Sequence, residues 1–173
     1  MKKVLGTFEI ESGEIRVSDP CYEKESKSGI SFKAKKGTWT AHINLNDEDR
    51  VASLVVVFKG KREKAGWTLV GDGGVDSGQM SIFDKSHFRK EGDKDKITSC
   101  WSGWEKKDEP DGGGFFYATC CSLTCGDDNG AKSKGGVLAH GAVSQTGYGD
   151  GGYPVQVKYN AEGEAVAVRV RFL

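Results

Sequence analysis

The sequence is poor in proline, has no excess of charge of either sign, and contains no long hydrophobic run. Only 3 of its 173 residues are proline, whereas 25 are glycine, about twice the ordinary ~7%. This composition is not that of a proline-rich linker. It favours many turns and bulges between short strands.

The balance of charge limits the kinds of partner. The chain has 25 Lys and Arg residues and 25 Asp and Glu residues, so its formal charge at pH 7 is zero. A general nucleic-acid binder needs a broad positive field that attracts phosphate. We therefore expect no general nucleic-acid binding, and the expected partner is a protein or small molecule of unknown identity.

The hydrophobic runs are too short for a membrane protein. The longest, Val51–Phe58, is interrupted by Ser53 and is far shorter than the ~20 residues of a membrane helix. Thr7 and Glu9 interrupt the first apolar stretch, so no signal peptide is predicted. An odd number of cysteines, five, without such a signal indicates reduced thiols. We expect a cytoplasmic protein without a membrane partner.

Strand patterns dominate what is present. The clearest is a C-terminal hairpin, in which Tyr153–Tyr159 and Val166–Phe172 alternate apolar and polar residues around a turn at Asn160–Gly163. The tetrad Gly-Asp-Gly-Gly, at Gly71–Gly74 and Gly149–Gly152, is interpreted as a turn before a strand. The other predicted strands are Val4–Ile10, Glu14–Val17, Gly37–Leu45, Val51–Lys59, Trp67–Val70, Val75–Phe83, Phe115–Leu123 and Gly136–Ser144.

These elements define the fold class. Residues 1–173 are predicted to form a single mainly β domain, a two-sheet antiparallel sandwich or open barrel with at most one or two short helices. A short helical turn is expected after Asp84, which can cap it. The charged segments Gly92–Lys96 and Glu105–Gly114, and the polar segment Gly126–Gly135, are expected to be loops.

Four aspartates are the first candidates for chemistry. If Asp19, Asp76 and Asp150, with or without Asp84, met in one pocket, they would form a hydrolase site or hold a divalent metal. The alternative is that each shapes a turn, because Asp19 precedes a proline and Asp150 lies between glycines. We favour the turn interpretation, and we predict neither a metal nor a cofactor.

A cysteine-protease site and a zinc site are weaker candidates than the aspartates. Cys100, His140 and Asn160 follow the chain order of a cysteine protease, but the residues after Cys100 are a poor helix start. His140 is interpreted as a core histidine in an apolar strand. Cys121 and Cys125 have a spacing that zinc accepts, with Cys100, Cys21 or His140 to complete the site, but no second ligand pair is present.

Aromatic residues near the loops are candidates for a binding surface. Trp39 and Trp67 lie in strand-like runs and are predicted to be core residues. An exposed tryptophan beside Gly103 would anchor a partner, because buried aromatic residues dominate interface energies. The predicted ligand- or partner-binding residues are Tyr22, Gln79, Trp101, Trp104, Tyr148 and Tyr153.

Three segments carry a family resemblance. They are Asp19-Pro20-Cys21-Tyr22, then Val75–Gln79 with Phe83-Asp84, and finally Gly147–Val155, which reads Gly-Tyr-Gly-Asp-Gly-Gly-Tyr-Pro-Val. With them the chain resembles a bacterial and phage family catalogued as a domain of unknown function, number 4241. The resemblance implies a cytoplasmic single-domain protein and assigns no catalytic role to any residue.

The function predicted from these observations is a non-enzymatic β-rich binding or interaction module. Its working surface would be the loops Asp19–Tyr22, Val75–Gln79 and Gly147–Tyr153, since loops gathered at one end of a sandwich commonly bind. The alternative is a hydrolase that uses Asp19, Asp76 and Asp150. The position of the three carboxylates in space distinguishes the two.

Overall fold

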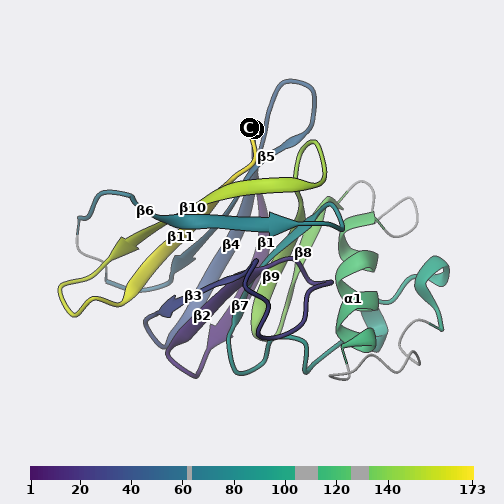
Figure 1. The fold of residues 1–173 in the computed structure, drawn as a ribbon, viewed down its shortest axis with the longest axis horizontal. Coiled ribbons are helices and arrows are strands. Elements are labelled where there is room, and N and C mark those ends of the chain that lie inside the picture. The colour runs from purple at the N-terminus through teal and green to yellow at the C-terminus, as the bar shows by residue number, and fades with distance from the viewer. Residues whose placement is uncertain (62–63, 104–112, 126–132) are drawn as a thin grey trace.

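The computed structural model describes residues 1–61, 64–103, 113–125 and 133–173 (Figure 1). Two antiparallel sheets face each other and do not close into a barrel. The prediction of a mainly β, two-sheet open fold is confirmed. Among the described residues, no helix has both the length and the apolar character needed to cross a membrane.

The six-stranded sheet has the order β1-β4-β5-β11-β10-β6, and the five-stranded sheet has the order β3-β2-β7-β9-β8. Inward-facing apolar side chains of both sheets form the main core, as the alternating pattern predicts. The strands are β1 (Lys2–Ile10), β2 (Glu14–Ser18), β3 (Ile30–Lys33), β4 (Gly37–Leu45), β5 (Val51–Phe58), β6 (Thr68–Val75), β7 (Gln79–Asp84), β8 (Gly135–Leu138), β9 (Gly141–Gln145), β10 (Gly151–Tyr159) and β11 (Ala165–Arg171).

One predicted strand is a helix. The segment predicted as a strand at Phe115–Leu123 lies in α1 (Gly114–Cys125), and eight of the twelve residues of this helix are buried. A helix buried on most sides has no amphipathic stripe, so periodicity does not distinguish it from a buried strand. Helix α1 covers β8 and β9 (Figure 1) and packs on a second apolar cluster that includes Phe83 and Phe88. Short 3-10 turns occur at η1 (Lys94–Lys96) and η2 (Ser99–Trp101).

The first Gly-Asp-Gly-Gly tetrad was wrongly predicted to be a turn. The tetrad Gly71–Gly74 lies inside β6, and the chain turns only after Val75. Gly74 pairs with Gly152 of the second tetrad, so the two tetrads lie side by side at the β6–β10 pairing. Glycine fits a strand where another backbone approaches closely or where a bulge is needed.

Three further predictions were wrong. The segment Val75–Phe83 is not one strand, because residues 76–78 form a bend between β6 and β7. The segment Gly136–Ser144 is not one strand but the hairpin of β8 and β9, with His140 in its turn. Trp67 is not a core residue: its ring is half-buried outside β6, near the side chains of Lys158 and Arg169. Trp39 is fully buried, as predicted. The segment after Asp84 forms a hydrogen-bonded turn, in which the Phe88 N–H donates to the Asp84 carbonyl (3.0 Å) and Asp84 Oδ1 accepts from the Ser86 N–H (2.9 Å). Most of the predicted loops Glu105–Gly114 and Gly126–Gly135 lies outside the described residues.

Candidate functional site

A buried aspartate joins two of the three predicted loops. Asp19 follows β2 and is fully buried. Its Oδ2 atom accepts hydrogen bonds from the backbone N–H groups of Asp76 (2.8 Å) and Ser77 (2.7 Å). Its Oδ1 atom accepts from the Cys21 N–H (2.7 Å), as expected of an Asx-turn, and from the Ser77 hydroxyl (2.6 Å). Both carboxylate oxygens are therefore used to hold loops.

The other two aspartates extend this network. The Tyr22 hydroxyl donates to Asp76 Oδ2 at 2.8 Å, and the Gly78 N–H donates to Asp150 Oδ1 at 2.9 Å. The three loops thus meet, and we refer to Asp19–Tyr22, Val75–Gln79 and Gly147–Tyr153 together as the three-loop end. Asp84 lies elsewhere, beside the β1–β2 turn. Among the described residues, these carboxylates form no group close enough to share a metal ion.

A hollow of about 340 Å³ lies at the three-loop end, between its loops and the C-terminal end of α1. Its walls are Ser77–Gln79, Thr124 with Cys125, and Gln145–Gly149. None of these lining residues is Asp, Glu, Lys, Arg or His. The size is that of a small ligand pocket, and such pockets use a few fixed polar groups for specificity.

The polar side chains of this hollow hold one another in place. Gln79 is only 3% exposed; its amide donates to the Ser77 hydroxyl (3.3 Å) and to the Cys121 sulfur (3.3 Å), and it accepts from the Thr124 hydroxyl (2.9 Å). Gln145 donates to the Thr124 carbonyl at 2.7 Å. The walls are therefore formed before any ligand arrives.

Two thiols on α1, those of Cys121 and Cys125, have pKa values shifted in opposite directions. The Cys121 thiol is buried and hydrogen-bonded to Cys125, which raises the pKa of Cys121 and lowers that of Cys125. Cys125 is exposed and lines the hollow. A thiolate is the reactive form of cysteine, and the lowered pKa of Cys125 favours that form at the edge of the hollow. Burial, followed by the nearby Asp19 charge, raises the pKa of Cys21 to about 12.

The predicted aromatic residues occupy different places. Tyr148 is 68% exposed at the rim of the hollow, and the Arg50 guanidinium lies 4.7 Å from its ring centroid. Tyr153 is half-buried, and its hydroxyl donates to the Gly149 carbonyl at 2.7 Å. Trp101 packs edge-on against Tyr117 of α1. Trp104 lies outside the described residues.

A second cluster, of two histidines and two glutamates, was not predicted from the sequence. His87 and His140 stack in parallel, with ring centroids 3.6 Å apart and an interplanar angle of 4°. Glu11 contacts Nε2 of His140 at 3.0 Å and Nε2 of His87 at 3.3 Å. Glu91 contacts Nδ1 of His140 at 2.9 Å and Nδ1 of His87 at 3.4 Å. We call these four residues the histidine–glutamate cluster.

This cluster corrects two predictions about His140. The residue is in a turn and only half-buried, so it is not a core histidine. Its described partners are the two glutamates, whereas Cys100 contacts Thr98 and Asn160 bonds its own turn. Burial acts to lower the pKa of His140, but its hydrogen bonds to the glutamates outweigh burial and raise it. The only sequence signal was that two of the three histidines each lie near a turn.

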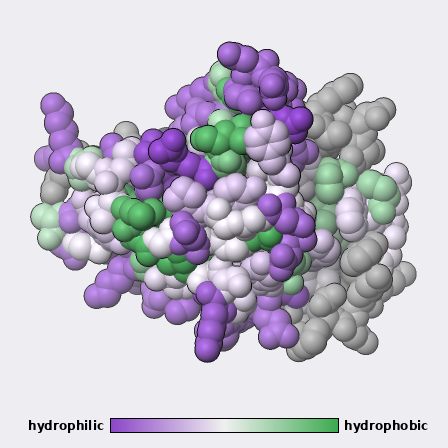
Figure 2. Space-filling model, turned by 45° about the horizontal axis from the view of Figure 1, so that its top comes forward, coloured by the Kyte–Doolittle hydropathy of each residue, from purple (hydrophilic) through white to green (hydrophobic). Residues whose placement is uncertain are grey.

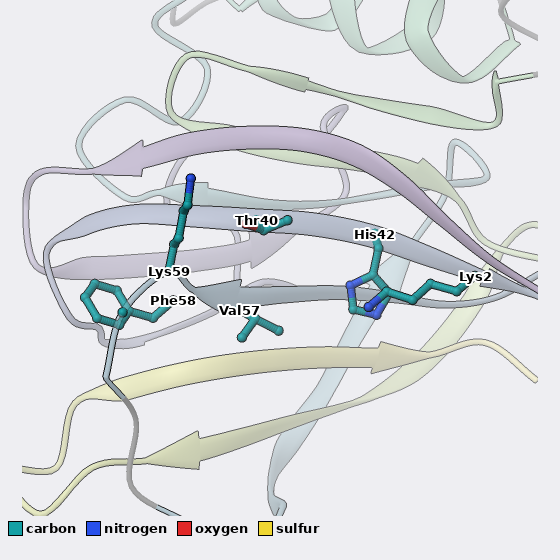
Figure 3. Close-up of a pocket in the computed structure, with 7 residues that line it drawn as sticks. Lys2, Thr40, His42, Val57, Phe58 and Lys59 are labelled. Carbon is teal, nitrogen blue, oxygen red and sulfur yellow. The ribbon is translucent and has the colours of Figure 1, made fainter.

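The outer face of the six-stranded sheet has a different character. One hollow of about 330 Å³ there is lined by Lys2, His42 and Lys59, with Lys2 lying beside the His42 ring (Figure 3). A neighbouring hollow of about 370 Å³ shares His42 and is bordered by Arg169 and Arg171. No acidic residue is among the described residues that line either hollow.

Exposed hydrophobic surface does not single out another site on the face drawn in Figure 2. That face is mostly hydrophilic, and its hydrophobic residues form small, separate areas. Isolated apolar residues of this kind are normal on a protein surface.

The fold and the three-loop end define a class of protein. It is an open two-sheet sandwich with one helix packed on a sheet, and it has a hollow between loops that no described Asp, Glu, Lys, Arg or His lines. Residues 8–170 match the family described as Protein of unknown function (DUF4241), and the chain belongs to this family. The family resemblance inferred from the sequence is confirmed. No curated protein and no solved structure matches the chain.

Proposed function

We propose that the chain is a non-enzymatic binding module whose hollow at the three-loop end takes an uncharged polar segment of a partner protein. The observation that carries the proposal is the preformed wall of hydrogen-bonded neutral side chains around that hollow. A site that is already rigid loses less entropy on binding than one that must order its side chains.

The state of the carboxylates favours binding over hydrolysis. The alternative hydrolase would use these aspartates, and at least one of them would have to deliver or accept a proton at the substrate. Asp19 is fully buried, and its carboxylate accepts hydrogen bonds from three backbone N–H groups of the loops and from the Ser77 hydroxyl. Asp76 and Asp150 each bond a neighbouring loop instead of each other. These contacts support a structural role for all three.

The rim of the hollow indicates a protein partner. Tyr148 and Arg50 lie together at the surface beside it, and tyrosine and arginine are residue types enriched in interface hot spots. Gln145 offers an amide at the wall, and a peptide backbone presents the complementary donors and acceptors. No Asp, Glu, Lys, Arg or His is among the described residues that line the hollow, so a segment with charged side chains finds no salt-bridge partner of these types there, and burying its charge costs free energy.

The cellular setting is part of the proposal. All five cysteines are free thiols, which is typical of a reducing compartment such as the cytoplasm. We place this one-domain module in a bacterial or phage cytoplasm, as the family resemblance implies.

Protection of Cys125 from alkylation tests the proposal. The protein is treated with a pulse of iodoacetamide in the presence of capped dipeptides, and labelling of each cysteine is measured by peptide mass spectrometry. Capped Asn-Ser and Gln-Gly peptides are expected to slow labelling of Cys125, which lines the hollow. Cys100, also exposed, is the internal control and keeps its rate.

Three comparisons make the result decisive. Capped Asp-Asp and Lys-Lys peptides are expected to give no protection, and Tyr148→Ala is expected to reduce protection by the neutral peptides. Equal slowing at both cysteines, or no slowing by any neutral peptide at millimolar concentration, contradicts the proposal.

A further inference from the structure

The histidine–glutamate cluster is a candidate for an ion site because of its donors and their spacing. Among the described residues, Glu11, His87 and His140 are the only group of His, Cys, Asp or Glu whose donor atoms all lie within 4.8 Å of one another. Two imidazoles and a carboxylate are a donor set that Zn²⁺ and other late first-row divalent ions accept. The 3.0 and 3.3 Å N···O distances at Glu11 are close to the roughly 3.4 Å that separates tetrahedral ligands bonded at ~2.0–2.1 Å.

Glu91 occupies the position that supports histidine ligands. It contacts the Nδ1 atoms of both rings, on the side away from Glu11. A histidine that binds a metal usually donates its other ring N–H to a carboxylate, which fixes the tautomer. A bound ion takes the place of the proton between Nε2 and Glu11. With Nδ1 still protonated toward Glu91, each ring then directs the lone pair of its Nε2 atom to the Glu11 side.

One buried residue fixes the three segments that carry these donors. Asp84 Oδ2 accepts from the Glu11 N–H at 2.6 Å. The Asp84 N–H donates to the His140 carbonyl at 2.8 Å, and the His87 N–H donates to the Asp84 carbonyl at 3.1 Å. The donors therefore project from a connected backbone frame and not from independent loops.

We propose that Glu11, His87 and His140 form a binding site for a divalent ion of the zinc class, oriented by Glu91. Glu11 is 60% exposed in its side chain, so a fourth coordination position faces solvent and takes water. The rings are now parallel. Binding one ion through both Nε2 atoms requires each ring to turn until the two lone pairs converge.

Calorimetric titration with ZnCl₂ tests the site. The full chain carries Cys100→Ser and Cys125→Ser, so that exposed thiols do not compete for zinc. We expect one Zn²⁺ per chain, a rise in melting temperature that EDTA reverses, and shifts of the His87 and His140 ring resonances. Mg²⁺, which prefers oxygen ligands, is expected to have no effect.

Matched variants assign the ligands. Glu91→Gln is expected to weaken Zn²⁺ binding about 10- to 100-fold, and His140→Gln or Glu11→Gln is expected to weaken it more. His42→Gln, on the outer face of the six-stranded sheet, is the control and keeps the affinity. If His140→Gln does not fold, Glu11→Gln still tests the site. Its substitution leaves the bond to Asp84 intact, because that bond is made by the Glu11 backbone N–H and not by the carboxylate. Absence of Zn²⁺ binding, or affinity unchanged in the folded ligand variants, overturns the proposal.

Discussion

Asp19 and Asp84 are both fully buried, and each accepts hydrogen bonds from a segment distant in the sequence. Asp19 joins two loops of the three-loop end, whereas Asp84 joins the β1–β2 turn to the end of β7. A buried carboxylate is tolerated only when its oxygens are well hydrogen-bonded. These two acids therefore fix the positions of the two candidate sites.

We expect Asp19→Asn to lower the free energy of unfolding by about 3 kcal/mol, because one oxygen becomes an NH₂ group facing N–H donors. Asp150→Asn is the matched control, since Asp150 accepts one described bond at an exposed position, and it is expected to cost about 1 kcal/mol or less. Urea unfolding measures both. Similar losses in the two variants would contradict the assignment of Asp19 as the principal link.

Asp84 also gives a pH prediction. Burial acts to raise its pKa, but hydrogen bonds from Ser12, Glu11 and Ser86 outweigh burial and lower it. The unfolded carboxyl titrates near a pKa of about 3.9, so the stabilisation is complete above that pH and is lost as pH falls through the lower folded pKa. We expect the stability difference between wild type and Asp84→Asn to be large at pH 7 and to shrink below about pH 4.

Unfolding by urea across pH 2 to 7 checks this. Asp47→Asn, at an exposed position in the β4–β5 turn, is the control and is expected to leave the acid profile unchanged. A difference for Asp84→Asn that stays constant across the range would rule out the carboxylate as its source.

At the scale of elements, alternation in the sequence was enough to predict the C-terminal hairpin and β4, because β4 and β10 bury alternate residues. It was not enough for α1, whose buried residues surround the helix. It also missed the turn in β8–β9, because Ala139 and His140 interrupt the apolar run too briefly to resemble a loop. The three loops were predicted to act together, and they do meet. The histidine–glutamate cluster was missed because tertiary packing alone brings its members together.

The β7–β9 pairing provides an element-scale test. A methyl group added at Gly141 would lie 1.9 Å from Cδ2 of Phe83, in the apolar cluster under α1. We expect Gly141→Ala to cost about 3 kcal/mol through overpacking. Gly152→Ala in β10 meets nothing within 4 Å and is expected to change stability by no more than about 0.5 kcal/mol. Thermal unfolding of both variants is the measurement, and equal stability would mean that the Phe83 ring moves aside freely.

At the scale of the whole molecule, the formal net charge is zero, but charged side chains are unevenly distributed over the surface. Cationic side chains line or border the two hollows on the outer face of the six-stranded sheet, and no acid is among their described lining residues. Salt screens such a surface over roughly 10 Å at 0.1 M. The positive field of this face is therefore local.

We expect the protein to be retained on a sulfonate cation exchanger at pH 7 and low salt, despite its neutral formal charge. The double variant Arg169→Gln/Arg171→Gln is expected to elute at lower salt, because both residues line one hollow. Lys33→Gln/Lys94→Gln removes the same charge from exposed positions elsewhere and is expected to shift elution less. Equal shifts would show that total charge, not the face, governs retention.

The contacts of Asp19 with the next loop have a consequence for variation among related chains. Two of them are made to main-chain N–H groups, at positions 76 and 77, and every amino acid except proline supplies that group. The side chain at position 76 is thus not needed for the Asp19 contacts, and a substitution there removes, of the described hydrogen bonds, only the one with the Tyr22 hydroxyl. A library randomised there and at position 148 would explore new specificities on an unchanged frame, much as antibody loops do on theirs.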